Sequence, residues 1–169
     1  IRLHPTGYPD MTFNTGNGID VEDYGYVYDM VLQPDGKIIL GGDFYSYDSY
    51  LVNKIVRINP NGSYDNTFIV GAGFNDTVLS LGLQSDGKII AGGTSTNSNF
   101  FLVCYNTNGS LDTSFGTNGI VTTSFSNNSI DQAYSVIIQP EDNKIVIGGY
   151  DLYNNTNKIS GFGLARYIN

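Results

Sequence analysis

Residues 27–42 read VYDMVLQPDGKIILGG, and the pattern returns as VLSLGLQSDGKIIAGG at 78–93 and as AYSVIIQPEDNKIVIGG at 133–149. Three copies of one phrase in one chain are typical of a repeat protein, in which each copy is a supersecondary unit that depends on its neighbours. The sequence therefore predicts an array of similar units rather than a fold built around a unique centre.

Each copy predicts two short strands joined by a tight turn. In the first copy, the side chains of Tyr28, Met30 and Leu32 fall on one face, because successive side chains of a strand alternate. Residues 34–36, PDG, favour a turn, since proline presets φ and glycine accepts a positive φ. A glycine pair then ends the second strand, which indicates a bulge or a close approach of the backbone.

One full period predicts more than these two strands. Extended segments are expected near 27–33, 37–44 and 53–59, followed by an ordered turn and a weaker fourth strand, which is clearer in the next period at 119–125. Four short antiparallel strands in a period of this length are typical of a propeller blade. The predicted fold class is all-β: a β-propeller-type array of about three four-stranded antiparallel blades, incomplete as a ring on its own.

The repeats also divide the chain. Residues 2–13, 57–68 and 104–115 match one another, so the chain starts and ends at the same phase of the repeat. This phase favours a piece of a longer polypeptide, or a chain that is completed by association. We expect one repeat array over residues 1–169, consisting of the tail of a broken blade (1–25), a first repeat (26–76), a second repeat (77–131) and the head of a third repeat (132–169).

The longest shared motifs resemble a known family. Residues 33–37, QPDGK, with the following Gly41-Gly42, and residues 108–119, NGSLDTSFGTNG, closely resemble the delta-60 repeat, the unit of a predicted β-propeller family of large bacterial surface and secreted proteins. The resemblance covers essentially the whole chain, although the third copy departs from it at 141–143 and the first lacks the Phe-Gly pair after Asp65. It implies a propeller fold and a surface or secreted setting, and it carries no catalytic signature. We expect an extracellular, cell-surface or virion-surface location.

The composition argues against several classes of function. With 14% charged residues and a net charge of −8, the chain lacks the clustered Lys and Arg that bind a nucleic-acid backbone. It contains no run of about 18 apolar residues that would cross a membrane. The single cysteine, Cys104, forbids an internal disulfide, and its strand-like context predicts a buried, inert thiol.

Catalytic patterns are weak in this sequence. His4 is the one histidine, so a histidine-based general base would have to be this residue, in a turn position. Carboxylates at 20–23 and at 43, 48 and 151 leave paired-carboxylate glycosidase chemistry open, although acidic loop residues are ordinarily solvated. The sequence favours a protein that is not an enzyme, with a hydrolase as a distant third interpretation.

Two turns space oxygen-bearing side chains like a short calcium loop. The weak metal candidates are Asn61 and Asp65 in one turn, and Asn108 and Asp112 in the other. Calcium prefers several carboxylates at such positions, whereas most of these groups are amides. We favour a turn in which Asn caps the backbone and Asp accepts from nearby N–H groups, with no cofactor and calcium only as a weak possibility.

The connections between the second and third strands of each repeat carry the stronger candidates for ligand binding. Tyrosine and short amides stack on sugar rings and bond their hydroxyls, or anchor a protein partner at low entropic cost. The alternative is that these aromatic side chains cover their own blades. The candidates are Tyr45, Tyr47, Tyr50, Asn97, Asn99, Tyr150, Tyr153 and Asn155.

The sequence favours a non-catalytic structural or adhesive module of a surface, fibre or virion protein. Its expected partners are itself or adjacent repeats, and glycans or a surface protein; nucleic acid and membrane insertion are not expected. The alternative is a lectin-like propeller that binds carbohydrate. A lectin would carry matching aromatic residues in every blade, but Tyr45 corresponds to Tyr150 and to Thr94, which favours the structural role.

Overall fold

The structure is a computed structural model that describes residues 1–19, 25–71, 74, 76–95, 99–125, 129–153 and 161–167. These residues form strands and loops, and among them no helix is long and apolar enough to span a membrane. The strands are β1 (Tyr26–Leu32), β2 (Ile38–Asp43), β3 (Ser46–Tyr47), β4 (Tyr50–Leu51), β5 (Ile55–Ile58), β6 (Val78–Leu83), β7 (Ile89–Thr94), β8 (Phe100–Tyr105), β9 (Ile120–Thr123), β10 (Ser129–Ile138), β11 (Ile145–Tyr153) and β12 (Gly161–Tyr167).

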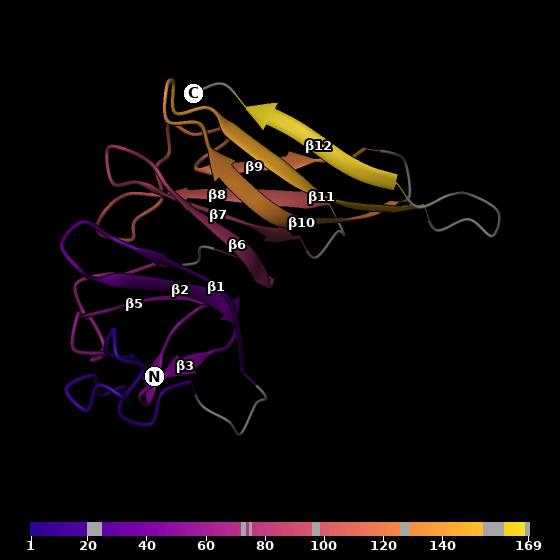
Figure 1. Cartoon of the computed structure of the whole chain (residues 1–169). Helices are drawn as coiled ribbons and strands as arrows, with labels where there is room; N and C mark the ends of the chain where they lie inside the picture. Colours follow the sequence, from indigo (N-terminus) through magenta and orange to yellow (C-terminus); the bar gives the residue numbers. More distant parts are fainter. Residues whose placement is uncertain are drawn as a thin grey trace.

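Three antiparallel sheets follow one another in chain order (Figure 1). The first sheet is β1-β2-β5, the second is β6-β7-β8-β9 and the third is β10-β11-β12, while β3 and β4 form a separate hairpin. β6 packs against β1 and β2, and β10 packs against β6 and β7, so each sheet lies on the next. The chain is an all-β, propeller-type array whose ring is not closed, as predicted, and its second sheet is a four-stranded blade.

The three sheets share one irregularity. In each of them the pairing of the first two strands shifts by one residue, between Val27 and Asp29, between Val78 and Ser80, and between Ala133 and Ser135. Such a shift is a β-bulge, which adds an unpaired residue and increases the local twist. Its recurrence at one repeat position confirms that the three copies are structural equivalents.

The second glycine of each doublet lies opposite this bulge. A Cβ atom on Gly42 would be 1.9 Å from the carbonyl oxygen of Tyr26, and the matching distances at Gly93 and Gly149 are 2.1 and 1.9 Å. Only glycine allows the paired strand to come so close. The predicted close approach of the backbone is therefore confirmed.

The turns between the first and second strands have the predicted backbone geometry. Gly36 and Gly87 have φ angles of 84° and 87°, and Asn143 has a φ angle of 55° in the longer third turn. The N–H of Gln139 donates to the carbonyl of Lys144 at 2.9 Å across that turn. Asparagine thus replaces glycine at little cost, because it tolerates the left-handed region.

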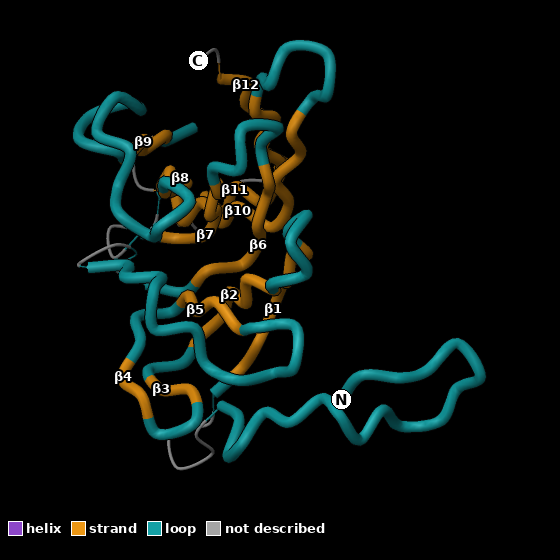
Figure 2. Tube along the Cα trace, turned by 90° about the vertical axis from the view of Figure 1, so that its left-hand side faces the viewer, coloured by secondary structure: helices purple, strands orange, loops and turns teal. Residues whose placement is uncertain are grey.

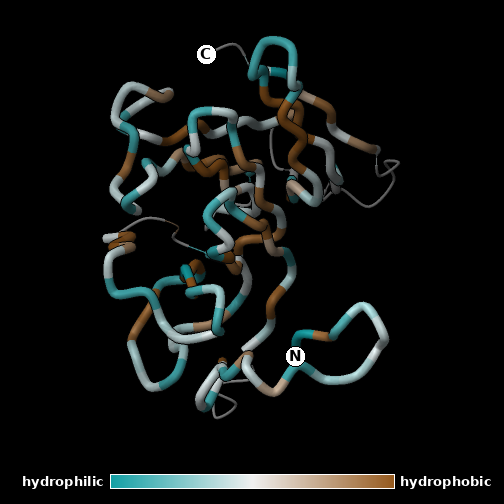
Figure 3. The backbone as a smooth tube through the Cα atoms, turned by 60° about the vertical axis from the view of Figure 1, so that its left-hand side comes forward, coloured by the Kyte–Doolittle hydropathy of each residue, from teal (hydrophilic) through white to brown (hydrophobic). Residues whose placement is uncertain are grey.

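Apolar side chains fill the spaces between neighbouring sheets. The core between the first and second sheets includes Ile39, Ile55, Leu81, Ile89 and Val103. The core between the second and third sheets includes Ile90, Leu102, Val136, Ile145 and Ile147. Figure 3 shows the hydrophobic positions, in brown, along the strands. Burial between sheets thus holds the array together, and the one cysteine is buried as expected.

The outer face of the first sheet is covered differently. A cluster of Leu40, Phe44, Tyr47, Val56 and Ile58 is closed by Phe13 and Ile19 from the N-terminal segment. Figure 2 shows that this segment also contains a long loop that runs away from the sheets. The N-terminal segment therefore packs on the first sheet without adding a strand to it.

The N-terminal segment and the end of the first repeat make equivalent bonds. The N–H of Asn14 donates to the carbonyl of Asn61 at 2.7 Å, and the N–H of Ile69 donates to the carbonyl of Asn108 at 3.0 Å. Residues 69–71 lie outside the strands, so this segment ties the first repeat to the second instead of extending the first sheet. The N-terminal segment therefore lies where the tail of a preceding repeat belongs.

Candidate functional site

The candidate metal residue Asp65 is the centre of a buried ion-pair cluster. Its Oδ2 accepts from Arg57 Nε at 2.6 Å and from Lys37 Nζ at 2.8 Å, and its Oδ1 accepts from Thr67. Burial by itself would raise the pKa of this carboxyl, but the hydrogen bonds from Lys37, Thr67 and Arg57 hold it well below its usual range. The side chain is 4% exposed, so protein cations occupy the place that a metal ion would need.

The second candidate turn is built in the same way. Asp112 Oδ2 lies 2.8 Å from Lys88 Nζ, and the hydrogen bonds from Lys88 and Ser114 lower the pKa of Asp112 to about 2. The amide oxygens of Asn61 and Asn108 each accept from a serine two residues later, as the favoured turn interpretation predicts. Among the residues that the structure describes, His, Cys, Asp and Glu side chains form no group of three or more that would hold a metal ion.

Cys104 takes the position that arginine has in the first repeat. Arg57 pairs with Ile39, and Cys104 pairs with Ile90 at the same register. Arg57 also reaches the next repeat, since its Nη1 donates to the carbonyl of Thr107 at 2.6 Å. Burial raises the pKa of the Cys104 thiol to about 12, which makes it unreactive at neutral pH.

The three predicted tyrosines of the first repeat lie in or beside the β3-β4 hairpin, in different environments. Tyr47 is buried, and its hydroxyl donates to the carbonyl of Gly62 at 2.6 Å. The structure thus places Tyr47 in the core, which corrects its assignment as a ligand residue. Tyr45 and Tyr50 are exposed, and Tyr50 stacks on Tyr64 with 4.4 Å between the ring centroids.

The remaining predicted ligand residues are spread over the second and third repeats. Asn97 and Asn155 lie outside the described residues. Asn99 pairs through its backbone with Ser95, while Tyr150 and Tyr153 belong to β11. The described candidates therefore belong to three different repeats: Tyr45, Tyr47 and Tyr50 to the first, Asn99 to the second, and Tyr150 and Tyr153 to the third.

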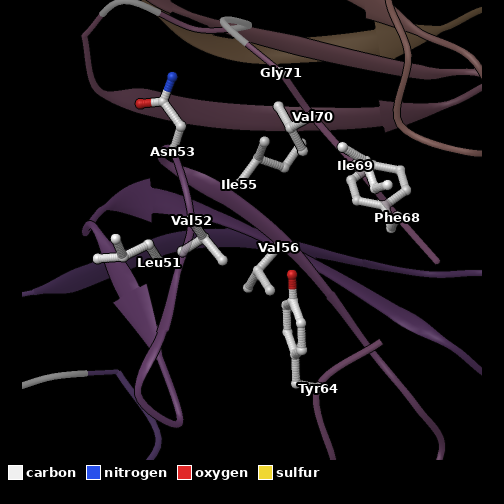
Figure 4. Close-up of a pocket in the computed structure, with 10 residues that line it drawn as sticks. All are labelled: Leu51, Val52, Asn53, Ile55, Val56, Tyr64, Phe68, Ile69, Val70 and Gly71. Carbon is white, nitrogen blue, oxygen red and sulfur yellow. The ribbon is translucent and has the colours of Figure 1, made fainter. Parts of the chain in front are cut away.

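A hollow of about 310 Å³ lies beside β5 in the first repeat (Figure 4). It is lined by Leu51, Val52, Asn53, Ile55, Val56, Tyr64, Phe68, Ile69, Val70 and Gly71. Figure 4 shows mainly aliphatic side chains around it, with polar side-chain atoms on Asn53 and Tyr64. In the second sheet, β9 pairs with β8 at the corresponding edge. The hollow therefore marks the place where the described residues provide no fourth strand for the first sheet.

The contact between neighbouring sheets has a fixed pattern at the first glycine of each doublet. A Cβ atom on Gly41 would lie 2.6 Å from Val78 and 3.2 Å from Leu81, and one on Gly92 would lie 2.6 Å from Val136. Leu81 and Val136 hold the same register position, because each pairs with the residue that precedes a first glycine. Each first glycine is therefore a socket for an apolar side chain of the next sheet.

A hydrogen bond accompanies each socket. Asp29, which pairs with Gly41, accepts from the N–H of Leu81 at 2.8 Å through its Oδ2. Ser80, the equivalent residue of the second sheet, accepts from the N–H of Val136 at 3.0 Å through its Oγ. Each junction between sheets thus combines one apolar insertion with one backbone N–H bound by a side-chain oxygen.

Both ends of the array present half of such a junction. On the third sheet, a Cβ atom on Gly148 would have only Leu164 of its own sheet within 4 Å among the described residues, at 3.8 Å, and Ser135 is exposed. On the first sheet, Met30 holds the position of Leu81 and is 61% exposed. The glycine doublets are visible in the sequence, and alignment of the three copies places Gly148 with Gly41 and Gly92, but the packing roles of these glycines depend on contacts between sheets.

Comparison with known proteins agrees with this architecture. Residues 33–68 and 84–115 match the family described as "Domain of unknown function (DUF5122) beta-propeller". No curated protein and no solved structure matches the chain. The two matched segments run from the turn between the first two strands to the aromatic residue after the Asp65 or Asp112 turn. They support the coarser part of the resemblance found in the sequence: the two matched segments are similar to repeats of a β-propeller family.

Proposed function

We propose that this chain is a non-catalytic structural or adhesive module of a surface, fibre or virion protein, completed by self-association or by neighbouring repeats. The observation that carries the proposal is the half-junction at each end of the array. Met30 and Leu32 on the first sheet, and Ile137 and Leu164 on the third, are each more than half exposed. Apolar sheet faces of this kind need a cover, since propeller blades depend on their neighbours.

The composition agrees with a role outside the cell. The chain is poor in charged residues and rich in tyrosine, and its net charge of −8 disfavours nucleic-acid partners. The sequence resemblance to delta-60 repeats of bacterial surface and secreted proteins points in the same direction. The junctions within the array are built from burial and hydrogen bonds, which need no reducing or oxidising environment.

The assembly mass in solution tests this proposal. Sedimentation equilibrium over a concentration series should give a multiple of the 18.4 kDa chain mass. A folded chain that stays monomeric at every concentration would contradict completion by self-association. Addition of further repeats to the same chain would then show whether neighbouring repeats cover the open faces instead.

A carbohydrate-binding function is the second candidate. One face of the Tyr50 ring stacks on Tyr64 and the residue is 52% exposed, beside the hollow of about 310 Å³. An exposed aromatic ring next to a groove is suited to stacking on a sugar. A glycan array should show binding that Tyr50→Ala abolishes. Tyr8→Ala, which changes a tyrosine of the N-terminal loop that is 74% exposed, should leave the binding intact. Equal loss in both variants would contradict a site at Tyr50.

A further inference from the structure

The two internal junctions of the array follow one rule. An apolar residue of the following sheet packs over the first glycine of the doublet. The backbone N–H of that apolar residue donates to the side chain of the residue that pairs with the glycine. The rule holds between the first and second sheets and between the second and third. It therefore describes what a further sheet must offer in order to pack at either end.

The outer face of the third sheet carries the glycine socket of such a junction. Gly148 is open, and Ser135, which pairs with it, is exposed. Around them, Ile137 is 58% and Leu164 is 63% exposed. These four residues form the socket face, and they occupy the positions that bury against the next sheet in the two internal junctions.

The outer face of the first sheet carries the apolar side chains that would insert into such a socket. Met30 corresponds to Leu81, and Val27 corresponds to Val78. Leu81 and Val78 are the two residues of the second sheet that pack against Gly41. Met30 and Val27 both lie at a mainly apolar hollow of about 370 Å³, with Leu40 behind them. The N–H of Met30 donates to the side chain of Asp29, its own neighbour, at 2.8 Å, where the rule requires a side chain of another sheet. We define Val27, Met30 and Leu40 as the insertion face.

Charge complementarity points to the same pairing. Lys37 and Lys88 each bind the aspartate in the tail of their own repeat, at 2.8 Å. Asp10 in the N-terminal segment occupies the same tail position, where it binds Arg2 and where no described lysine forms an ion pair with it. Lys144 is the third lysine of the series, and its ion pair is with Asp142 in its own turn. If the third sheet of one copy packs on the outer face of the first sheet of another copy, Lys144 of the one comes close to Asp10 of the other.

We propose that a second copy of this chain is the occupant: the insertion face of one copy packs on the socket face of the other, with Met30 over Gly148. Ser135 then accepts from the N–H of Met30. This inference rests on the proposed function and specifies its interface. Two copies supply six sheets, which lies within the roughly 4 to 8 blades of closed propellers, and a two-fold axis makes both junctions identical.

Sedimentation of the full chain and two variants tests the interface. Gly148→Leu fills the socket, and the open space around Gly148 lets the single chain fold unchanged. Met30→Lys places a charge on the insertion face at an exposed position. Each change should raise the dissociation constant of the dimer by about 100-fold or more. Gly148→Leu blocks the contact sterically, and Met30→Lys would bury an unpaired charge. Gly161→Leu is the control and should leave the dimer intact, because no atom of the described residues lies within 4 Å of a Cβ added at Gly161.

A mixture of the two variants tests the direction of the contact. The Gly148→Leu copy keeps its insertion face and the Met30→Lys copy keeps its socket face, so the mixture should form a heterodimer through one sound junction. An interface made of the same face on both copies would give no such rescue. A wild-type dimer that both variants leave unchanged overturns this interface while self-association stands, and a monomeric wild type overturns both.

Discussion

Asp65 is a residue on which the first repeat depends. It accepts hydrogen bonds from Lys37, Arg57 and Thr67, and Arg57 continues to the carbonyl of Thr107 in the second repeat. One carboxylate thus fixes the turn of its own repeat and orients a side chain that reaches the next. The sequence identified Asp65 by its spacing, but the identity of its cationic partners depends on sheet pairing.

Replacement of this carboxylate should be costly. Asp65→Asn leaves Lys37 and the buried Arg57 without a counter-charge, so we expect a loss of about 2–4 kcal/mol in the free energy of unfolding. Urea denaturation measures it. The control is Asp35→Asn in the exposed turn, where asparagine still accepts the N–H of Lys37, with an expected change within about 0.5 kcal/mol. Equal effects of the two changes would contradict the role of the ion pairs.

The same carboxylates make stability depend on acid pH. The pKa of Asp112 is lowered to about 2 from its ordinary 3.8, and that of Asp65 is lowered as well. A lowered folded-state pKa stabilises the fold above the unfolded-state value and loses that stabilisation as pH falls through the folded-state value. Urea titrations from pH 7 to pH 2 should therefore show a difference between wild type and Asp112→Asn that shrinks below about pH 4. A difference that is constant with pH would contradict this assignment.

At the scale of the strands, the first glycine of each doublet is the most constrained position. Gly92→Ala places a Cβ 2.6 Å from Val136 in the packed core between the second and third sheets. We expect a loss of about 1–3 kcal/mol, because overpacking forces the neighbouring strand to shift. Thermal and urea unfolding measure the loss. The control is Gly161→Ala, because no atom of the described residues lies within 4 Å of a Cβ added there. A neutral Gly92→Ala variant would show that the socket has more room than this contact implies.

The strands of the repeat were predictable, and the β3-β4 hairpin was not. Strands expected near 27–33, 37–44 and 53–59 are observed as β1, β2 and β5, because their alternation and turn residues are local signals. The turn of this hairpin is formed by Asp48 and Ser49, whose φ angles are 48° and 68°. It lacks the Asn-Gly pair by which such turns are usually recognised in a sequence.

The candidate site shows the same limit of sequence-based prediction. Tyr47 is buried because a distant segment pairs with it at Ile19 and because Gly62 accepts its hydroxyl, and neither contact is local in sequence. The turn role of Asn61 and Asn108 was predicted, since an Asn side chain bonds within two residues of itself. The open socket at Gly148 becomes visible only when the sheets that surround its equivalents are known.

At the scale of the whole molecule, the three sheets form a row in which the second sheet packs between the first and the third. The second sheet is covered on both faces, whereas the first and third are each covered by one neighbouring sheet. The stability of the end sheets therefore depends on what packs against their outer faces.

Hydrogen exchange should report this dependence strand by strand. In the wild-type dimer we expect comparable protection of β1, β7 and β10, because every sheet then has two neighbours. In the Gly148→Leu variant, amides of β1 and β10 should exchange faster while those of β7 keep their protection. A uniform loss over all three strands would mean that the substitution destabilises the fold rather than uncovering its ends.

The first glycine of each doublet has a consequence for the evolution of such arrays. The second repeat inserts an apolar side chain at Gly41 of the first repeat and receives Val136 of the third repeat at Gly92, so its two boundaries are of the same kind. Recombination that duplicates or removes one unit joins matching surfaces without compensating substitutions. Arrays of this kind can change length in single genetic steps, and their connecting loops are free to diverge meanwhile.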